Sequence, residues 1–172
     1  MEYFFSLLLG IVAGYVASYC FLTSFLYYKK PRIVISPHIS IDEFKGEKNY
    51  FFKFVNKTKS NIYDVRIETT LYKPIGDLKG RNLHGADIEL KDNYFMYISA
   101  ESSGDEHNLH VMRVRTTQDI EGQWVDGSSF IRLTVIAKHS LSGLNQVFHQ
   151  DFNNIACITN KKFVSGNDLG VV

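Results

Sequence analysis

The sequence predicts one membrane-spanning helix followed by an all-β domain, a sandwich or a small barrel. The first supporting feature is an uncharged stretch of 26 residues, 3–28. It is long enough to cross a bilayer core of about 30 Å at the helical rise of about 1.5 Å per residue. The second feature is a series of short apolar runs after residue 32, and the third is a set of Gly- and Pro-containing turns between them.

Length, charge and cysteine content narrow the class of protein. The chain has 172 residues, which is room for one domain with a short appendage. Its 19 basic and 18 acidic residues leave a net charge of +1, so we expect no nucleic-acid partner. The hydrophobic content of 45% argues against a disordered chain. Only two cysteines, Cys20 and Cys157, are present, which argues against a disulfide scaffold.

The uncharged stretch has the ends of a membrane span rather than those of a cleaved signal peptide. Tyr3 and Tyr28 lie at its two limits, where aromatic rings favour the headgroup region. A signal peptide would begin with positive charge, whereas Glu2 precedes this stretch.

The expected parts of the chain are a tip, a transmembrane helix, a basic linker, a β-sandwich domain and a loose tail. Their limits are 1–2, 3–28, 29–32, 33–164 and 165–172.

Three basic residues, Lys29, Lys30 and Arg32, directly follow the predicted span. Lys and Arg concentrate on the cytoplasmic side of spans, so we expect a cytoplasmic C-terminal domain and a span in the inner membrane of the cell. The same residues are candidates for contact with anionic lipid headgroups, since each could gain about 1 kcal/mol at an anionic leaflet. The alternative is that they only fix the topology.

Small residues recur every fourth position of the span, at Ser6, Gly10, Gly14 and Ser18. This spacing places them on one helix face, where small side chains let two helix backbones approach closely. The stripe therefore predicts self-association into a homo-oligomer. The alternative is that glycine and alanine are simply common in membrane helices.

The segment after residue 32 shows strand periodicity and no sustained helical period. The clearest strand covers residues 63–71. The residues expected on its buried face are Tyr63, Val65, Ile67, Thr69 and Leu71. A later strand at 129–138 is expected to bury Ile131, Leu133, Val135 and Ala137. The other expected strands cover 33–35, 50–55, 94–99, 109–115, 147–152 and 156–159.

Few residues after position 32 suggest a catalytic or metal site. His107 and His110, beside Asp105 and Glu106, have the composition of a metal site, but a solvated loop is the stronger interpretation. No cysteine–histidine pair and no nucleophile-elbow motif is present in the sequence, so we expect no catalytic residue, no metal and no cofactor.

Two other features are candidates for binding. Trp124 is expected to be a core aromatic rather than a ligand platform. The segment 73–92 is expected to be a long loop, and long loops in compact domains are often binding elements. Its charges are mixed and indicate no particular ligand.

Parts of the chain resemble the inward-rectifier potassium channels. The resemblance begins with the basic linker Lys29-Lys30-Pro31-Arg32 and continues through Phe52-Lys53-Phe54-Val55-Asn56 and Lys59-Ser60-Asn61-Ile62. A second patch covers residues 130–152. The resemblance implies an immunoglobulin-like cytoplasmic β-sandwich, a tendency to oligomerise, and anionic-lipid contact by Lys29, Lys30 and Arg32. It implies no pore, because the sequence has one apolar span and no filter motif.

These observations together predict a non-catalytic, membrane-anchored binding module that acts in sensing, regulation or as an effector. A membrane-anchored effector of a bacterial defence system would have this layout. One alternative is an accessory subunit of a larger membrane complex. Another is a membrane-anchored hydrolase, which would require a concave cluster of titratable residues with perturbed pKa values. The small-molecule or protein ligand is left open.

Overall fold

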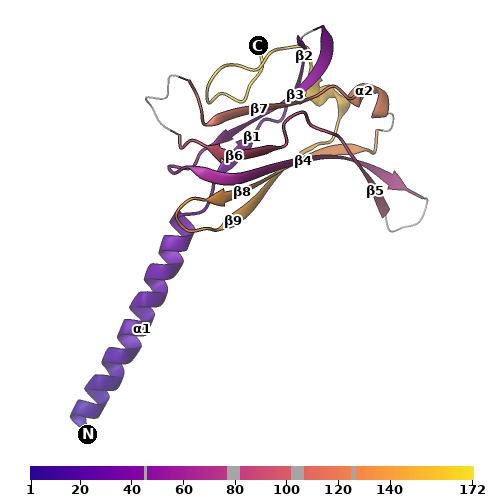
Figure 1. Cartoon of the computed structure of the whole chain (residues 1–172). Coiled ribbons are helices and arrows are strands. Elements are labelled where there is room, and N and C mark those ends of the chain that lie inside the picture. Colours follow the sequence, from indigo (N-terminus) through magenta and orange to yellow (C-terminus); the bar gives the residue numbers. More distant parts are fainter. Residues whose placement is uncertain (45, 77–81, 102–106, 125–126) are drawn as a thin grey trace. The chain divides into compact units, whose positions relative to one another are not determined.

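The computed structural model describes residues 1–44, 46–76, 82–101, 107–124 and 127–172 (Figure 1). The chain forms two units, Met1–Lys30 and Pro31–Val172. The first contains one helix, α1 (Glu2–Tyr28), and the second is built mainly of strands. The prediction of an all-β domain after one N-terminal helix is therefore confirmed.

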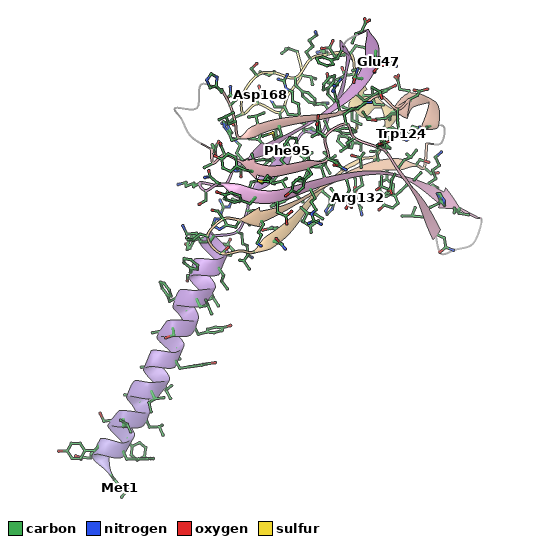
Figure 2. All side chains as sticks on the ribbon, in the orientation of Figure 1. Met1, Glu47, Phe95, Trp124, Arg132 and Asp168 are labelled. Carbon is green, nitrogen blue, oxygen red and sulfur yellow. The ribbon has the colours of Figure 1, made fainter. Side chains whose placement is uncertain are left out.

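Helix α1 is long and apolar enough to cross a membrane. None of its residues is buried, and its side chains project on all sides (Figure 2). Its one charged residue, Glu2, lies at the N-terminal end, where the helix dipole favours negative charge. The Thr23 hydroxyl donates to the Tyr19 carbonyl at 2.9 Å, so this polar group is satisfied within the helix.

The second unit holds ten strands in two sheets within the described residues. The strands are β1 (Ile33–Ile35), β2 (Ile39–Phe44), β3 (Glu47–Asn56), β4 (Ile62–Ile75), β5 (Asn82–Asp87), β6 (Tyr94–Ile98), β7 (Val111–Thr116), β8 (Phe130–His139), β9 (Asn145–Phe152) and β10 (Ile158–Thr159). Two short helices, α2 (Ile120–Gln123) and η1 (Ile155–Cys157), complete the elements.

Each sheet is organised around one long central strand. In the first sheet, β3 pairs with β7 along one side and with β1 and β2 in succession along the other, and β10 lies parallel to β2. In the second sheet, β4 pairs with β8 along one side and with β5 and β6 along the other, and β9 pairs with β8. All pairings except β10 with β2 are antiparallel.

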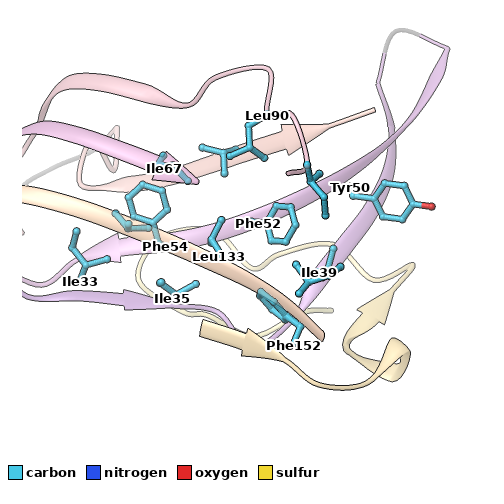
Figure 3. Close-up of a cluster of buried hydrophobic side chains, with 14 of the residues drawn as sticks. Ile33, Ile35, Ile39, Tyr50, Phe52, Phe54, Ile67, Leu90, Leu133 and Phe152 are labelled. Atoms are coloured by element: carbon cyan, nitrogen blue, oxygen red, sulfur yellow. The ribbon is translucent and has the colours of Figure 1, made fainter. Parts of the chain in front are cut away.

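The two sheets contribute to one hydrophobic core (Figure 3). Phe52 of the first sheet and Phe152 of the second lie edge to face, with ring centroids 5.7 Å apart. The predicted inner row of β8 is confirmed, because four residues at alternating positions are fully buried. These are Ile131, Leu133, Val135 and Ala137.

The predicted inner row of β4 is correct except at its start. Tyr63 is 39% exposed, whereas its neighbour Ile62 is fully buried. The pairing of β4 with β8 shifts between Tyr63 and Arg66, and Asp64 has a positive φ of 49°. This β-bulge adds one residue to the strand, so it reverses which side chain faces the core.

Two strands lie where the sequence shows no clear signal. The burial pattern of β2 does not alternate, and it places Ile39 and Ser40 side by side as buried residues. The segment 73–92, expected to be a loop, contributes the end of β4 and the whole of β5, which pair antiparallel from Thr70↔Asp87 to Ile75↔Asn82. Residues 77–81 lie outside the described residues.

The C-terminal segment, expected to be loose from residue 165, is held against the outer side of the first sheet. Lys53 is fully buried, and its Nζ donates to the carbonyls of Val164 (2.6 Å) and Asp168. The Ser36 hydroxyl donates to the Leu169 carbonyl at 2.7 Å. Val172 exchanges two backbone hydrogen bonds with Lys162. These contacts give the segment a fixed course over β3.

Candidate binding site

An interruption in the edge of the second sheet creates an open cavity. Strand β6 pairs with the start of β4 and β5 pairs with its end, which leaves residues 67–69 between them. There the backbone N–H of Ile88 donates to the Thr69 carbonyl at 2.8 Å, and the Ile67 N–H donates to the Asn93 carbonyl at 2.8 Å. In the chain between Ile88 and Asn93, the backbone N–H of Lys91 donates to the Arg115 carbonyl of β7 at 2.8 Å. The chain therefore crosses from the second sheet to the first and returns.

This crossing leaves a cavity of about 510 Å³, which we call the edge notch. Its volume lies within the range of about 300–1,000 Å³ that is typical of small-ligand sites. The residues that line it are Ile67, Glu68, Thr69, Asp87, Ile88, Glu89, Leu90, Asn93 and Gln118. The apolar members are buried core residues, and Ile67 and Leu90 appear in Figure 3.

The polar lining of the edge notch is acidic. Glu68, Asp87 and Glu89 are among its lining residues, and no Lys or Arg is among the described ones. Thr69 is 2% exposed, and its Oγ1 has no hydrogen-bond partner among the described residues. The side chain lies on the buried face of β4, as do Ile67 and Leu71.

A second polar cluster joins β3 to α2. The Tyr50 hydroxyl lies 3.0 Å from Glu121 Oε2 and 3.2 Å from Asp119 Oδ1, and Lys48 pairs with Glu121. Hydrogen bonds from Lys48 and Tyr50 hold the pKa of Glu121 below its ordinary value. The backbone N–H of Gly122 is the main cause of the lowered pKa of Asp119, which caps α2.

Burial and hydrogen bonds within this cluster cause the shifted pKa values of Tyr50 and Lys48. Burial is the main cause of the raised pKa of Tyr50, and the hydrogen bond to Glu121 is the main cause of the raised pKa of Lys48. Each charged group is paired with another member, and Lys48 is 54% exposed at its side chain. These contacts therefore hold α2 against the first residues of β3.

The structure describes only part of the segment around His107 and His110, for which a solvated loop is the stronger expectation. Asp105 and Glu106 lie outside the described residues. His110 is buried, and its Nε2 lies 2.5 Å from Asn167 Oδ1, so it contacts the C-terminal segment. Among the described residues, no three His, Cys, Asp or Glu side chains are grouped closely enough to hold a metal ion.

Other residues singled out in the sequence have structural roles. Trp124 is 5% exposed and its Nε1 donates to the Ser129 carbonyl at 3.1 Å, so it is a core aromatic as expected. Cys20 and Cys157 are both free thiols. Asn56 begins a glycosylation sequon, but it is fully buried and its amide donates to the Ser99 carbonyl at 2.7 Å. Its side chain is not accessible for glycosylation.

The candidate lipid-contact residues flank the boundary between the two units. In the first unit, Lys30 Nζ lies 5.4 Å from the centre of the Tyr27 ring, a cation–π contact. In the second unit, the backbone N–H of Arg32 donates to Thr58 Oγ1 at 2.8 Å, and the Arg32 side chain is exposed. Lys29 is half-buried.

The small-residue stripe of α1 is open along its length. All of α1 is exposed around Ser6 and Ser18, and a Cβ added at Gly10 or Gly14 would meet no atom within 4 Å. Nothing in the chain itself therefore requires glycine at these two positions.

The edge-notch residues had only a weak signal in the sequence, which was the mixed charge of the segment 73–92.

The comparisons provide no relative from which a function could be transferred. No protein-family model matches the chain, and no curated protein matches it significantly.

Proposed function

We propose that this protein is a single-pass membrane protein whose strand domain is a non-catalytic binding module at the cytoplasmic face of the inner membrane. It acts in sensing, regulation or as an effector, and it self-associates through its span. The observation that carries the proposal is the length and apolar composition of α1, a 27-residue helix whose one charged residue is Glu2. Large side chains such as Leu9 (74% exposed) and Phe21 (72% exposed) would be unfavourable in water and favourable in lipid.

The strand pairings support an immunoglobulin-like β-sandwich for the second unit. In that fold, strands A, B, E and D form one sheet and strands C, F and G form the other. In the first sheet here, β1 and β2 together take the place of strand A, β3 that of B and β7 that of E. In the second sheet, β4, β8 and β9 take the places of C, F and G. The hydrogen bond from Lys91 to the Arg115 carbonyl places residues around 91 beside β7, where strand D would lie.

The charges around the helix support the proposed orientation. Glu2 precedes α1, and Lys29, Lys30 and Arg32 follow it. The positive-inside tendency places the basic side in the cytoplasm. The two free thiols and the buried Asn56 are compatible with a reducing compartment without glycosylation.

Two other functions make different predictions. An accessory subunit would copurify with a larger membrane complex, whereas the proposed module would self-associate without one. A membrane-anchored hydrolase would need a concave, titratable site. The pKa shifts of the Lys48–Glu121 cluster arise from pairing within the cluster and from α2 capping, so they favour a structural role.

Protease accessibility tests the proposal directly. In intact cells, a protease added outside should leave the strand domain whole, whereas in inverted membrane vesicles it should remove that domain. The chain should stay in the membrane fraction after a carbonate wash. Cleavage of the domain in intact cells would refute the orientation, and release of the uncleaved chain by carbonate would refute the span.

A further inference from the structure

We infer that the free edge of β9 is an interface at which two copies of this chain pair strand against strand. Strand β9 lies at the margin of the second sheet (Figure 1), and among the described strands its partner is β8. The inference rests on the proposed self-association and names the surface of the strand domain that takes part in it.

The register of the β8–β9 hairpin determines which backbone groups of β9 point away from β8. The His139 N–H donates to the Leu144 carbonyl at 2.9 Å, so residues 139 and 144 form a hydrogen-bonded pair. Such pairs alternate along antiparallel strands, and the register from Lys138↔Asn145 to Ile131↔Phe152 contains no shift. The even-numbered residues of β9 therefore bond to β8. The backbone N–H and C=O groups of residues 145, 147 and 149 point to the other side.

That other side of β9 is open between residues 145 and 149. No backbone hydrogen bond joins these groups to another described segment. An open cavity of about 350 Å³ lies beside them, lined by β1 and by residues 147–150. The open edge ends at Asp151, whose carbonyl accepts from the side-chain amide of Gln150 at 2.9 Å. The free edge is therefore a short segment with Val147 at its centre.

This edge lacks the features that keep the sheets of natural proteins from pairing with one another. Exposed edge strands usually carry lysine, proline or a bulge. Residues 145–149 read Asn-Gln-Val-Phe-His, and their pairing with β8 is regular. The central residue Val147 is apolar and 57% exposed. The composition and geometry of the edge therefore favour the addition of another strand.

The self-complementary sequence of the edge identifies a second copy as the added strand. Antiparallel pairing about a two-fold axis at Val147 places this residue opposite its own equivalent. It also places Asn145 of each copy opposite His149 of the other. The central pair is apolar, the flanking pairs can hydrogen-bond, and residues 145–150 include no Asp, Glu, Lys or Arg, so no like charges meet. The three pairs exchange about six backbone hydrogen bonds.

The small size of this contact makes it dependent on the span. A five-residue edge is too short to be a standard stable interface between free proteins. Two copies whose spans associate, however, hold their strand domains at a high effective concentration. We therefore expect edge pairing in the full chain, and we expect it to weaken when the spans are separated by G10L with G14L.

Cysteine crosslinking of the full chain in neutral detergent micelles tests the register. The background is C20S with C157S, which removes both free thiols. Opposite Cα atoms of a hydrogen-bonded pair lie about 5.5 Å apart, within the range of a disulfide. V147C should therefore give a disulfide-linked dimer under mild oxidation, and N145C combined with H149C should do the same. N145C alone and H149C alone should not, because each residue would lie roughly 14 Å from its own equivalent.

A charge placed at the edge provides an independent test by sedimentation in the same micelles. V147K puts a lysine at the centre of the edge and should weaken self-association several-fold. Its resistance to urea should be unchanged, because the side chain is exposed. M96K is the matched control, since Met96 is 75% exposed on β6, at the opposite margin of the same sheet. It should sediment as the unaltered chain does.

The outcomes separate this inference from the proposed self-association. If the chain sediments as an oligomer but neither V147C nor the N145C–H149C pair crosslinks, the edge is not its interface and the inference is overturned, while self-association stands. A monomer at every concentration would overturn both. Crosslinking of N145C alone would indicate parallel pairing and would contradict the two-fold arrangement. An equal loss of self-association in V147K and M96K would show a general effect of charge, and would also overturn the inference.

Discussion

Lys53 shows how one buried cation organises a terminal segment. It lies on the outer side of β3, where alternation along the strand would place a solvent-exposed residue. The C-terminal segment covers it instead, and backbone carbonyls take the place of water around its ammonium group. Burial, with a contribution from Arg113, lowers the pKa of Lys53. Two directed hydrogen bonds thus satisfy the buried amine.

Replacing Lys53 with methionine should release the C-terminal segment. The carbonyls of Val164 and Asp168 would lose their shared donor, and we expect a loss of about 2 kcal/mol in the free energy of unfolding. Urea denaturation measures this loss, and hydrogen exchange should accelerate in residues 160–172. K138M, at an exposed position, is the control. Unchanged exchange in 160–172 would show that Lys53 does not hold the segment.

Tyr50 supplies the hydroxyl that connects β3 to the acidic residues of α2. Y50F keeps the buried ring and removes the hydroxyl that hydrogen-bonds to Glu121 and Asp119 and interacts with Lys48. We expect a loss of about 1.5 kcal/mol in the free energy of unfolding, since bonds to charged acceptors are stronger than neutral ones. Thermal unfolding of Y50F beside Y97F, which alters an exposed tyrosine, measures the difference. Equal stabilities would contradict this role.

The lowered pKa of Glu121 predicts an acid-dependent contribution to stability. A carboxyl whose folded pKa lies below its unfolded value stabilises the fold above the unfolded value of 4.5, and that contribution disappears as the pH falls through the folded pKa. E121Q should therefore flatten the decline in stability below about pH 4.5. Urea titrations from neutral to acidic pH compare E121Q with E43Q. Parallel acid profiles would refute the assignment.

At the scale of elements, α1 and the central strands are stabilised in different ways. Helix α1 satisfies its backbone internally, as a helix that crosses lipid must. Strands β3 and β4 each have partners on both sides, so they depend on residues distant in sequence. The edge notch arises at this scale, because β5 and β6 divide one side of β4 between them and leave a gap at residues 67–69.

Replacing Gly10 and Gly14 together with leucine should weaken self-association several-fold. A Cβ added at either position would meet no atom within 4 Å, so we expect the effect to arise at the contact with a second helix. Sedimentation in detergent reports the oligomer size. V12L with V16L adds bulk on the opposite face and should have no effect. An unchanged oligomer in the glycine variant would refute the stripe as an interface.

At the scale of the whole molecule, the basic linker has a role only if the chain sits in an anionic membrane. Replacing Lys29, Lys30 and Arg32 with glutamine should reduce the binding of anionic lipid to the micelle-bound chain about tenfold or more, at about 1 kcal/mol per charge. Fluorescence titration with a labelled anionic lipid measures this. The control replaces three exposed lysines, Lys59, Lys138 and Lys161. Equal binding in all three proteins would leave topology as the only role of the linker.

Several features of the fold could be predicted because they depend on local patterns. Helix α1, which is long and apolar enough to cross a membrane, follows from hydrophobic length, and β8 follows from alternation that is uninterrupted from Ile131 to Ala137. The start of β4 could not be predicted, since the bulge at Asp64 is a backbone feature without a distinct sequence signal. Strand β5 was missed because its residues are mostly exposed and depend on β4 for their hydrogen bonds.

The sequence alone determined that the chain has an apolar helix of membrane-crossing length, a basic flank and a body made of strands, because length, charge and alternation are local properties. Only the tertiary structure decided that Lys53 and His110 hold the C-terminal segment, and that Thr69 shares a cavity with Asp87 and Glu89. Those residues are separated along the chain, and their proximity depends on how strands pair across both sheets. Pairing between distant strands is a cooperative result of packing, which no single segment encodes.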